Sequence, residues 1–257
     1  MAGQATMIWG YHPVSEALRA RRRKIYTLYI ARERKEPRSE ALFKMADHQG
    51  APVQIVTMAE LTAMVGHGRH QGIGARVSEY PKCSVDDILS SARSDIAQPF
   101  VLVLDQIVDP QNLGAIARTA QCAGIHGIVM PKDRSAPPSP AASKASAGAL
   151  EHMPLAYVTN LTHALKRFKL DGLWIAGADH RSATSVFEAD LSGPLAIVIG
   201  GEEKGIRRLV KKQCDFTVSI PQIGPIGSLN ASVASAVILY EAFRQRRKDF
   251  SRKPNCH

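Results

Sequence analysis

The sequence predicts an α/β protein with a parallel sheet in its C-terminal part, preceded by a smaller α/β domain. From residue 100 onward, mostly apolar runs of strand length alternate with helical segments, which is the pattern of a parallel sheet covered on both faces. Shorter strands and helices alternate before residue 80, whereas residues 81–98 have the Pro-, Ser- and Asp-rich composition of a linker. We therefore predict domains at 1–80 and 99–257, joined by a linker at 81–98.

The first domain contains three predicted helices and three predicted strands. Helical spacing of apolar residues begins after Pro13 and recurs at residues 39–49 and 58–65. The predicted strands cover residues 25–30, 53–57 and 73–77. This alternation indicates a small, independent α/β domain of ordinary size.

The second domain contains five predicted strands, each a mostly apolar run that suits burial on both faces. They cover residues 100–104, 127–130, 173–176, 195–199 and 216–220. The predicted helices between and after them cover residues 113–123, 143–150, 161–169, 206–213 and 229–247.

The composition favours a polyanionic partner and excludes several other classes. Lys and Arg outnumber Asp and Glu by 33 to 23, a net charge of +10 that suits phosphate contacts. The four cysteines are far apart and form no C-x-x-C pair, so they read as reduced thiols. No apolar run approaches the length of a membrane span and no leader segment stands out, so we expect a cytoplasmic protein without a membrane partner.

One histidine pair and one basic cluster are candidate binding sites, the first for a metal ion and the second for RNA. His67 and His70 are the only close histidine pair, and because no carboxylate or thiol of fitting spacing accompanies them, we expect no metal. Residues 21–24 form the basic cluster Arg-Arg-Arg-Lys, which is either an RNA phosphate contact, together with Arg69, or a solvated loop.

Three loops follow predicted strands at the edge where ligands of open parallel sheets bind. The loop after Leu104 leads into a helix that carries Asn112 and Arg118. The loop after Ile199 is rich in glycine, and the loop after Ile220 precedes a helix of small residues. Each loop alone also fits a simpler role as a helix cap or as a turn with solvated acids. A P-loop, a dinucleotide fingerprint and a nucleophile elbow are all missing from the sequence.

Taken together, the loops resemble the three motifs of the SpoU, or TrmH-like, branch of the SPOUT RNA methyltransferases. The matching segments are residues 112–119, 199–206 and 220–234. The N-terminal half is similar to the substrate-binding domain of the RlmB type, which methylates a guanosine 2′-hydroxyl in 23S rRNA. The segments that carry this likeness are residues 10–14 and 70–73, and residues 131–136, in the second domain, also fit the RlmB type.

The resemblance implies a SPOUT domain with a trefoil knot, which binds S-adenosyl-L-methionine, and a homodimer that shares its active sites. It also implies that the N-terminal domain resembles ribosomal-protein RNA-binding modules and selects the RNA. The expected activity is 2′-O-methylation of a guanosine ribose in 23S rRNA. Methylation of transfer RNA or of another rRNA site is the alternative within the superfamily, and a non-catalytic RNA-binding protein is the alternative outside it.

The resemblance also carries site residues over to this sequence. Those that match the family's cofactor-holding backbone positions are Gly200, Ile220 and Leu229. Those that match its active-site positions are Asn112, Arg118, Glu202, Ser228 and Asn230. Glu202 fits the G-x-E register, with the adjacent Glu203 as the alternative acid. Arg118 is the family's proposed proton acceptor; because arginine stays protonated, our interpretation is that it holds the RNA phosphate and stabilises the developing alkoxide.

Overall fold

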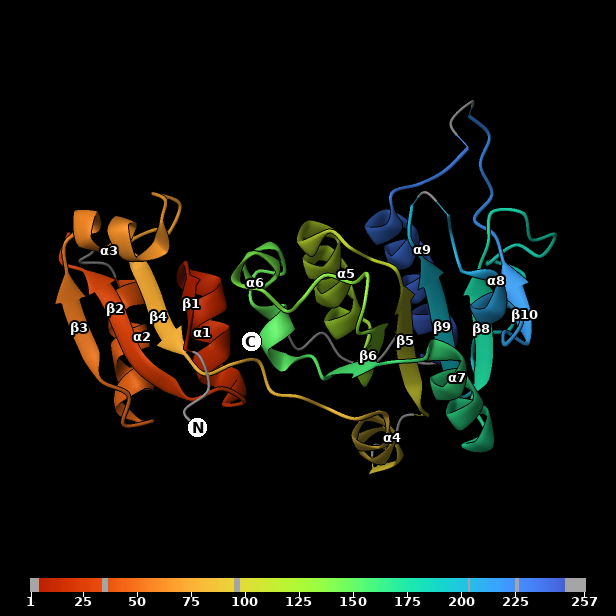
Figure 1. Ribbon diagram of the computed structural model, residues 1–257, viewed down its shortest axis with the longest axis horizontal. Coiled ribbons are helices and arrows are strands. Elements are labelled where there is room, and N and C mark those ends of the chain that lie inside the picture. The colour runs from red at the N-terminus through yellow and green to blue at the C-terminus, as the bar shows by residue number, and fades with distance from the viewer. Residues whose placement is uncertain (1–4, 34–36, 95–97, 203, 225–226, 248–257) are drawn as a thin grey trace. The chain divides into compact units, whose positions relative to one another are not determined.

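The computed structural model describes residues 5–33, 37–94, 98–202, 204–224 and 227–247 (Figure 1). The chain divides into two compact units, which are described separately. The first unit combines Met1–Lys82, Asp109–Arg118 and Ala136–Met153. The second combines Cys83–Val108, Thr119–Ser135 and Pro154–His257. Glu203 and Pro225, both part of the predicted motifs, lie outside the described residues.

The first unit is built on a four-stranded sheet with the order β1-β4-β2-β3. These strands are β1 (Thr6–Trp9), β2 (Ile25–Ala31), β3 (Val53–Val56) and β4 (Ile73–Val77). β4 pairs antiparallel with both β1 and β2, whereas β2 and β3 are parallel. Strand β1 was not predicted; it is a four-residue edge strand with only Ile8 fully buried, so its apolar pattern is weak.

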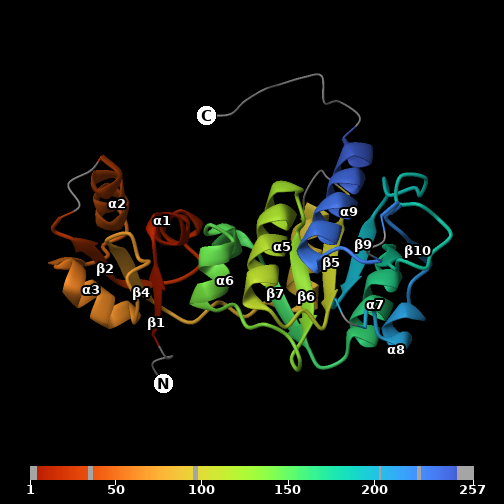
Figure 2. The ribbon, with the colours of Figure 1, turned by 90° about the horizontal axis from the view of Figure 1, so that it is seen from above.

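Helices cover the two faces of this sheet unequally. Figure 2 shows α1 (Tyr11–Ala20) and α2 (Pro37–Asp47) on one side and α3 (Met58–Val65) on the other. The α1 and α2 side holds the main core, with Leu18, Leu28 and Leu42 among its fully buried members. α3 begins as predicted because Thr57 and Glu60 form a capping box, in which each side chain accepts a hydrogen bond from the other's backbone N–H.

The helix predicted at residues 143–150 is in fact two short helices, α6 (Pro140–Ala145) and a 3-10 helix, η1 (Ala149–His152). The break falls at Ala147 and Gly148, which have φ values of 51° and 86°. A Cβ at Gly148 would lie 2.7 Å from the carbonyl oxygen of His12, so the close approach of α1 requires glycine there. Because this break depends on a tertiary contact, helical spacing could not reveal it.

The second unit contains the predicted parallel sheet, with six strands in the order β10-β8-β9-β5-β6-β7. All neighbours are parallel. The strands are β5 (Phe100–Asp105), β6 (Gly127–Pro131), β7 (Leu155–Val158), β8 (Trp174–Ala178), β9 (Leu195–Gly200) and β10 (Phe216–Val218). β5 lies between β9 and β6, so the strand order reverses beside β5, and ligands of open α/β sheets bind near such a reversal. The short edge strand β7 was not predicted.

Helices cover both faces of the parallel sheet. α7 (Leu161–Leu170) and α8 (Arg208–Lys211) lie on one side and α9 (Ala231–Arg246) on the other (Figure 2). Phe168 of α7 and Val210 of α8 belong to the core that packs on the sheet.

Helix α5 (Pro110–Cys122) begins three residues earlier than predicted, since Asp109 accepts a hydrogen bond from the backbone N–H of Gln111.

Part of the predicted linker is instead a helix, α4 (Val85–Ser94). Its apolar residues Ile88, Leu89 and Ala92 are buried, and the first two join the core of the second unit. The Ile88 side chain packs so closely on β6 that a Cβ at Gly127 would lie 2.7 Å from it. The linker prediction was therefore wrong for this stretch, where the polar composition belongs to the solvent side of an amphipathic helix. The division into domains 1–80 and 99–257 stays a prediction.

The basic cluster at residues 21–24 divides into structural and exposed members. Arg23 is buried: its Nε donates to the carbonyl oxygen of Ser78 at 2.8 Å, and its guanidinium pairs with the buried carboxylate of Glu151 at 3.4 Å. Arg22 donates to the carbonyl oxygen of Met153 at 2.7 Å. These two arginines hold the first unit together, so both alternatives for the cluster, an RNA phosphate contact and a solvated loop, are wrong for the buried Arg23.

Within the described part of the chain, no helix is both long and apolar enough to span a bilayer.

Candidate active site

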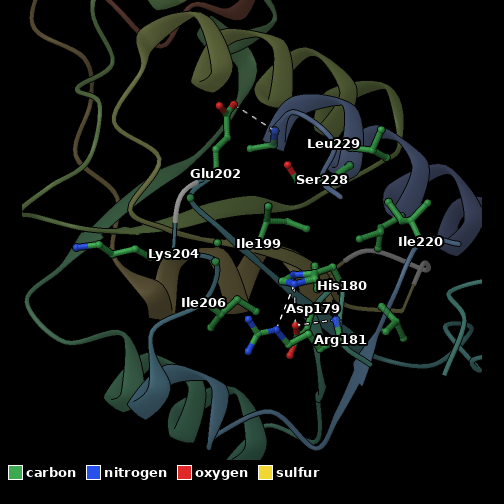
Figure 3. A pocket seen from close by; sticks show the side chains of 18 of the residues that line it. Asp179, His180, Arg181, Ile199, Glu202, Lys204, Ile206, Ile220, Ser228 and Leu229 are labelled. Atoms are coloured by element: carbon green, nitrogen blue, oxygen red, sulfur yellow. Dashed lines mark hydrogen bonds and ion pairs between the residues drawn. The ribbon is translucent and has the colours of Figure 1, made fainter. Parts of the chain in front are cut away.

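A cavity of about 590 Å³ opens at the carboxyl ends of β8, β9 and β10 (Figure 3). Its walls come from the loops that follow these three strands and from the start of α9. Two of these loops were predicted as binding loops, and the cavity lies at the edge where parallel strands expose their carboxyl ends. Gly200, Ile220 and Leu229, the three predicted cofactor residues, all line it, together with Glu202 and Ser228.

The glycine-rich loop after β9 folds back onto its own first residue. A Cβ at Gly200 would lie 2.1 Å from the carbonyl carbon of Gly205 and 2.2 Å from the amide nitrogen of Ile206. Gly205 has a φ of 61° and donates its N–H to the carbonyl oxygen of Gly201 at 2.9 Å. Glycine at position 200 therefore lets the chain approach itself closely, and this turn forms one wall of the cavity.

An ion pair between a buried carboxylate and an exposed arginine anchors the same loop to β5. The Asp105 carboxylate is fully buried and accepts from Arg207, through the backbone N–H at 2.9 Å and through Nε at 2.7 Å. The carbonyl oxygen of Asp105 also accepts from the N–H of Gly201 at 2.9 Å. This pair could not be predicted from the sequence, because the two residues are 102 positions apart and the parallel pairing of β5 with β9 brings them together.

Two predicted active-site residues, Glu202 and Asn230, meet at the first turn of α9. The Oε1 atom of Glu202 accepts from Nδ2 of Asn230 at 2.5 Å and from the N–H of Ala231 at 3.3 Å. The Oδ1 atom of Asn230 accepts from the N–H of Ser232 at 2.9 Å, so Asn230 is the N-cap of α9. The helix cap that this loop could supply is therefore Asn230 and not Ser228. A carboxylate here is stabilised by the positive end of the helix dipole.

The other end of the cavity is charged. Asp179, which follows β8, accepts from the Nζ of Lys211 and from the backbone N–H of Arg181 at 3.0 Å. Partial burial of the Asp179 carboxylate opposes its ionisation, but these hydrogen bonds and the nearby cations outweigh it and lower its pKa. Figure 3 shows Asp179, His180 and Arg181 together, away from Glu202 and Ser228. The role of Asp179 could not be predicted from the sequence, because its partner Lys211 is 32 positions away.

His70, one of the two histidines considered as metal ligands, has a structural role. It is fully buried, its Nδ1 accepts from the N–H of Gly72 at 3.1 Å, and its Nε2 lies 2.9 Å from the hydroxyl of Thr62. Since Nδ1 accepts, the proton lies on Nε2 and is donated to Thr62. Among the residues that the structure describes, no group of three or more potential ligands could hold a metal ion.

The family follows from comparison with known proteins. The model of the SpoU rRNA Methylase family matches residues 99–240. The chain belongs to this family. A second model, described as RNA 2′-O ribose methyltransferase substrate binding, matches residues 7–83. The predicted SpoU membership and the predicted RNA methyltransferase class are thereby confirmed.

Curated relatives are similar to this SpoU family member along nearly their whole length. YacO of Bacillus subtilis, named as a TrmH family tRNA/rRNA methyltransferase, is 41% identical over 246 residues, which cover 96% of this chain and 98% of that protein. The 23S rRNA (guanosine-2′-O-)-methyltransferase RlmB of Escherichia coli K12 is 37% identical over 243 residues, covering 93% and 98%. RlmB of Pseudomonas putida is 38% identical over 247 residues, covering 95% and 98%.

Solved structures share the fold. AviRb of Streptomyces viridochromogenes, a SpoU methyltransferase in complex with the cofactor AdoMet, superposes with a TM-score of 0.79 at 25% identity, covering 94% of this chain and 90% of that one. The AdoMet-bound rRNA methyltransferase of Sinorhizobium meliloti has a TM-score of 0.77 at 24% identity and covers 93% and 87%. The predicted α/β architecture with a parallel-sheet SpoU domain is confirmed.

The two remaining predicted residues of the SpoU motifs lie on α5, in the first unit. Asn112 is half-buried in the first turn and Arg118 is exposed two turns later. Gly114 allows tight packing of this turn, because a Cβ there would lie 2.6 Å from the carbonyl oxygen of Ala142. The convergence of Asn112 and Arg118 with Glu202 and the rest of the predicted site stays a prediction.

Proposed function

We propose that this protein methylates the 2′-hydroxyl of a guanosine ribose in 23S rRNA, with S-adenosyl-L-methionine as methyl donor. The observation that carries the proposal is the cavity, whose walls contain the predicted cofactor residues and Glu202, the partner of Asn230. The RlmB relatives named for this reaction cover nearly the full chain at 37–38% identity. YacO's name also includes transfer RNA, which remains the alternative substrate.

The cavity fits the proposed cofactor. Its volume lies within the range of small-molecule sites, and its apolar walls, such as Ile199, Val218 and Ile238, suit an adenine ring. Its charged end, around Asp179, suits a zwitterionic amino acid. Gly200, Ile220 and Leu229 would hold the cofactor through their backbone groups. When bound, S-adenosyl-L-methionine supplies an electrophilic methyl group on its sulfonium.

The residues of this chain must align the ribose hydroxyl and ease the loss of its proton, because a hydroxyl is a weak nucleophile. We propose that Arg118 holds the RNA phosphate and stabilises the developing alkoxide, and that Asn112 and Ser228 orient the ribose. Glu202 and Asn230 act as positioning residues, since each is tied to the first turn of α9. An Arg118→Lys variant with near-normal single-turnover rates would contradict the role of Arg118.

A homodimer is the proposed oligomeric state, as in the family that the sequence resembles. Its support in this structure is the outer side of α9, where Val233 and Tyr240 are about half exposed and one heptad apart. Large apolar side chains that share a helix face commonly mark a protein interface.

A trefoil knot and a cytoplasmic location also belong to the proposal. The support for both is the resemblance to the SpoU family.

The experiment that tests the proposed reaction is mapping of 2′-O-methyl groups in 23S rRNA and transfer RNA from cells that lack the protein. We expect one guanosine of 23S rRNA to lose its methyl group and to regain it on complementation. An Arg118→Ala copy should fail to restore it. A lost methyl group in transfer RNA alone would support the alternative substrate, and unchanged methylation in both RNAs would refute the proposal.

A further inference from the structure

One face of the four-stranded sheet in the first unit is only partly covered. α3 has eight residues, and its contact with the sheet buries little besides Tyr29, Val56 and Leu61. The opposite face packs against both α1 and α2 and holds the main core. The sheet surface beside α3 therefore has room for side chains that do not serve the core.

The strand register shows which side chains lie on the α3 face. In the β1–β4 pair, Met7 lies opposite Arg76 and Trp9 lies opposite Gly74. Residues opposite each other share a face, and so do residues two positions apart in a strand. Met7 packs on the α3 core, so Trp9 and Arg76 lie on the same side as α3.

The exposed part of this face has an aromatic ring flanked by two cations. The pairing of β2 with β4 shifts between Ile25 and Thr27, and Tyr26 lies at this irregularity. The guanidinium carbon of Arg76 is 5.9 Å from the centroid of the Tyr26 ring, and the Nζ of Lys24 is 5.6 Å from it. Both cations are exposed and Tyr26 is half-buried.

Among the described residues, no acid neutralises either cation. In the portion of the chain that is described, Lys24 and Arg76 form no ion pair with an acid, whereas Arg23 is committed to Glu151. Two unpaired positive charges beside one ring suit an external anion. Farther along the same face, the Trp9 and His67 rings meet edge to face with centroids 4.8 Å apart.

We propose that Lys24, Tyr26, Arg76, Trp9 and His67 form a contact surface for a single-stranded segment of the substrate RNA. The two cations take phosphates, and the aromatic rings stack on unpaired bases, which is the combination used for single-stranded nucleic acid. We call these five residues the Tyr26 surface. The inference rests on the proposed function, since it assumes that RNA is the substrate.

The first test measures binding of the full-length protein to a short, fluorescein-labelled single-stranded RNA of mixed sequence, by anisotropy at several salt concentrations. Lys24→Ala and Arg76→Ala should each weaken binding and together reduce the salt-dependence slope by about 1.4, at roughly 0.7 per lost phosphate contact. Lys44→Ala is the matched control, because Lys44 is exposed on α2, on the opposite side of the sheet. It should leave both affinity and slope unchanged.

The second test separates ring stacking from charge. Tyr26→Leu should lower RNA affinity by about tenfold, whereas Tyr26→Phe, which keeps the ring, should stay within about twofold of the wild type. Thermal unfolding of each variant checks that the sheet is intact. If Tyr26→Leu does not fold, the Lys24 and Arg76 variants decide the question by themselves.

The inference is overturned if Lys24→Ala and Arg76→Ala bind the RNA as tightly as Lys44→Ala does. It is also overturned if the wild-type protein does not bind the RNA. Methyl transfer to 23S rRNA is measured in parallel, where the Lys24 and Arg76 variants should raise KM and keep kcat. If the wild type binds RNA through this surface but transfers no methyl group, the proposed reaction fails and the surface stands.

Discussion

Replacing Gly200 by alanine should disrupt the cavity. The new Cβ would lie 2.1 Å from the carbonyl carbon of Gly205, 2.2 Å from the nitrogen of Ile206 and 2.4 Å from the oxygen of Gly205. These are backbone atoms, so no change of rotamer relieves the overlap and the loop itself must move. Overpacking of this kind costs about 1–3 kcal/mol. Displacement of the loop also weakens its hydrogen bonds to Asp105, each of which contributes about 1 kcal/mol.

We therefore expect Gly200→Ala to lose about 2–4 kcal/mol of unfolding free energy in urea titrations. The affinity for S-adenosylhomocysteine, measured by calorimetry, should fall by at least tenfold, because this loop forms a wall of the cavity. Gly193→Ala is the matched control, since a Cβ at Gly193 meets nothing within 4 Å. A Gly200→Ala protein as stable as Gly193→Ala, with unchanged affinity, would refute this reasoning.

Three further predictions concern other parts of the chain. Arg23→Met should cost about 3–5 kcal/mol in urea titrations, because it leaves the carboxylate of Glu151 buried and unpaired; a cost below 1 kcal/mol would contradict this. Burial lowers the pKa of His70 from its ordinary 6.5, so the unfolded chain binds this proton more readily and stability should fall as pH drops below about 6.5. His70→Gln should make the unfolding free energy less dependent on pH. A variant with the same pH profile of stability as the wild type would contradict this role of His70. Tyr240→Glu should convert the proposed dimer to a monomer in light-scattering measurements; a dimer that survives would place the interface elsewhere.

Elements with strong local signals could be predicted from the sequence. The bounds predicted for α3 and β4 agree with the structure, because a capping box starts the first and a run of apolar residues forms the second. β1 and β7 were missed because each is a four-residue edge strand, and it is pairing with a distant partner that makes it a strand. The amphipathic helix α4 was mistaken for a linker because only three of its side chains are buried.

Much of the candidate site could also be predicted. Gly200, Ile220 and Leu229 line one cavity as expected, because parallel strands bring the loops after their carboxyl ends to one edge. Asp179 was missed because its role depends on Lys211, 32 positions away in the sequence. The predicted loops therefore line the observed cavity, whereas side chains that pair across long sequence distances could not be predicted.

By itself, the sequence determined most of the helices and strands, because these depend on periodicity, capping and short-range spacing, which are properties of consecutive residues. Its resemblance to the SpoU family determined the family and the residues of the three motifs. The tertiary structure alone decided the partners of those residues. In the basic cluster, Arg23 is buried against Glu151 whereas Lys24, the next residue, is exposed beside Tyr26. The two neighbours differ because Arg23 is buried and pairs with a residue more than a hundred positions away. The composition counts both residues only as positive charges.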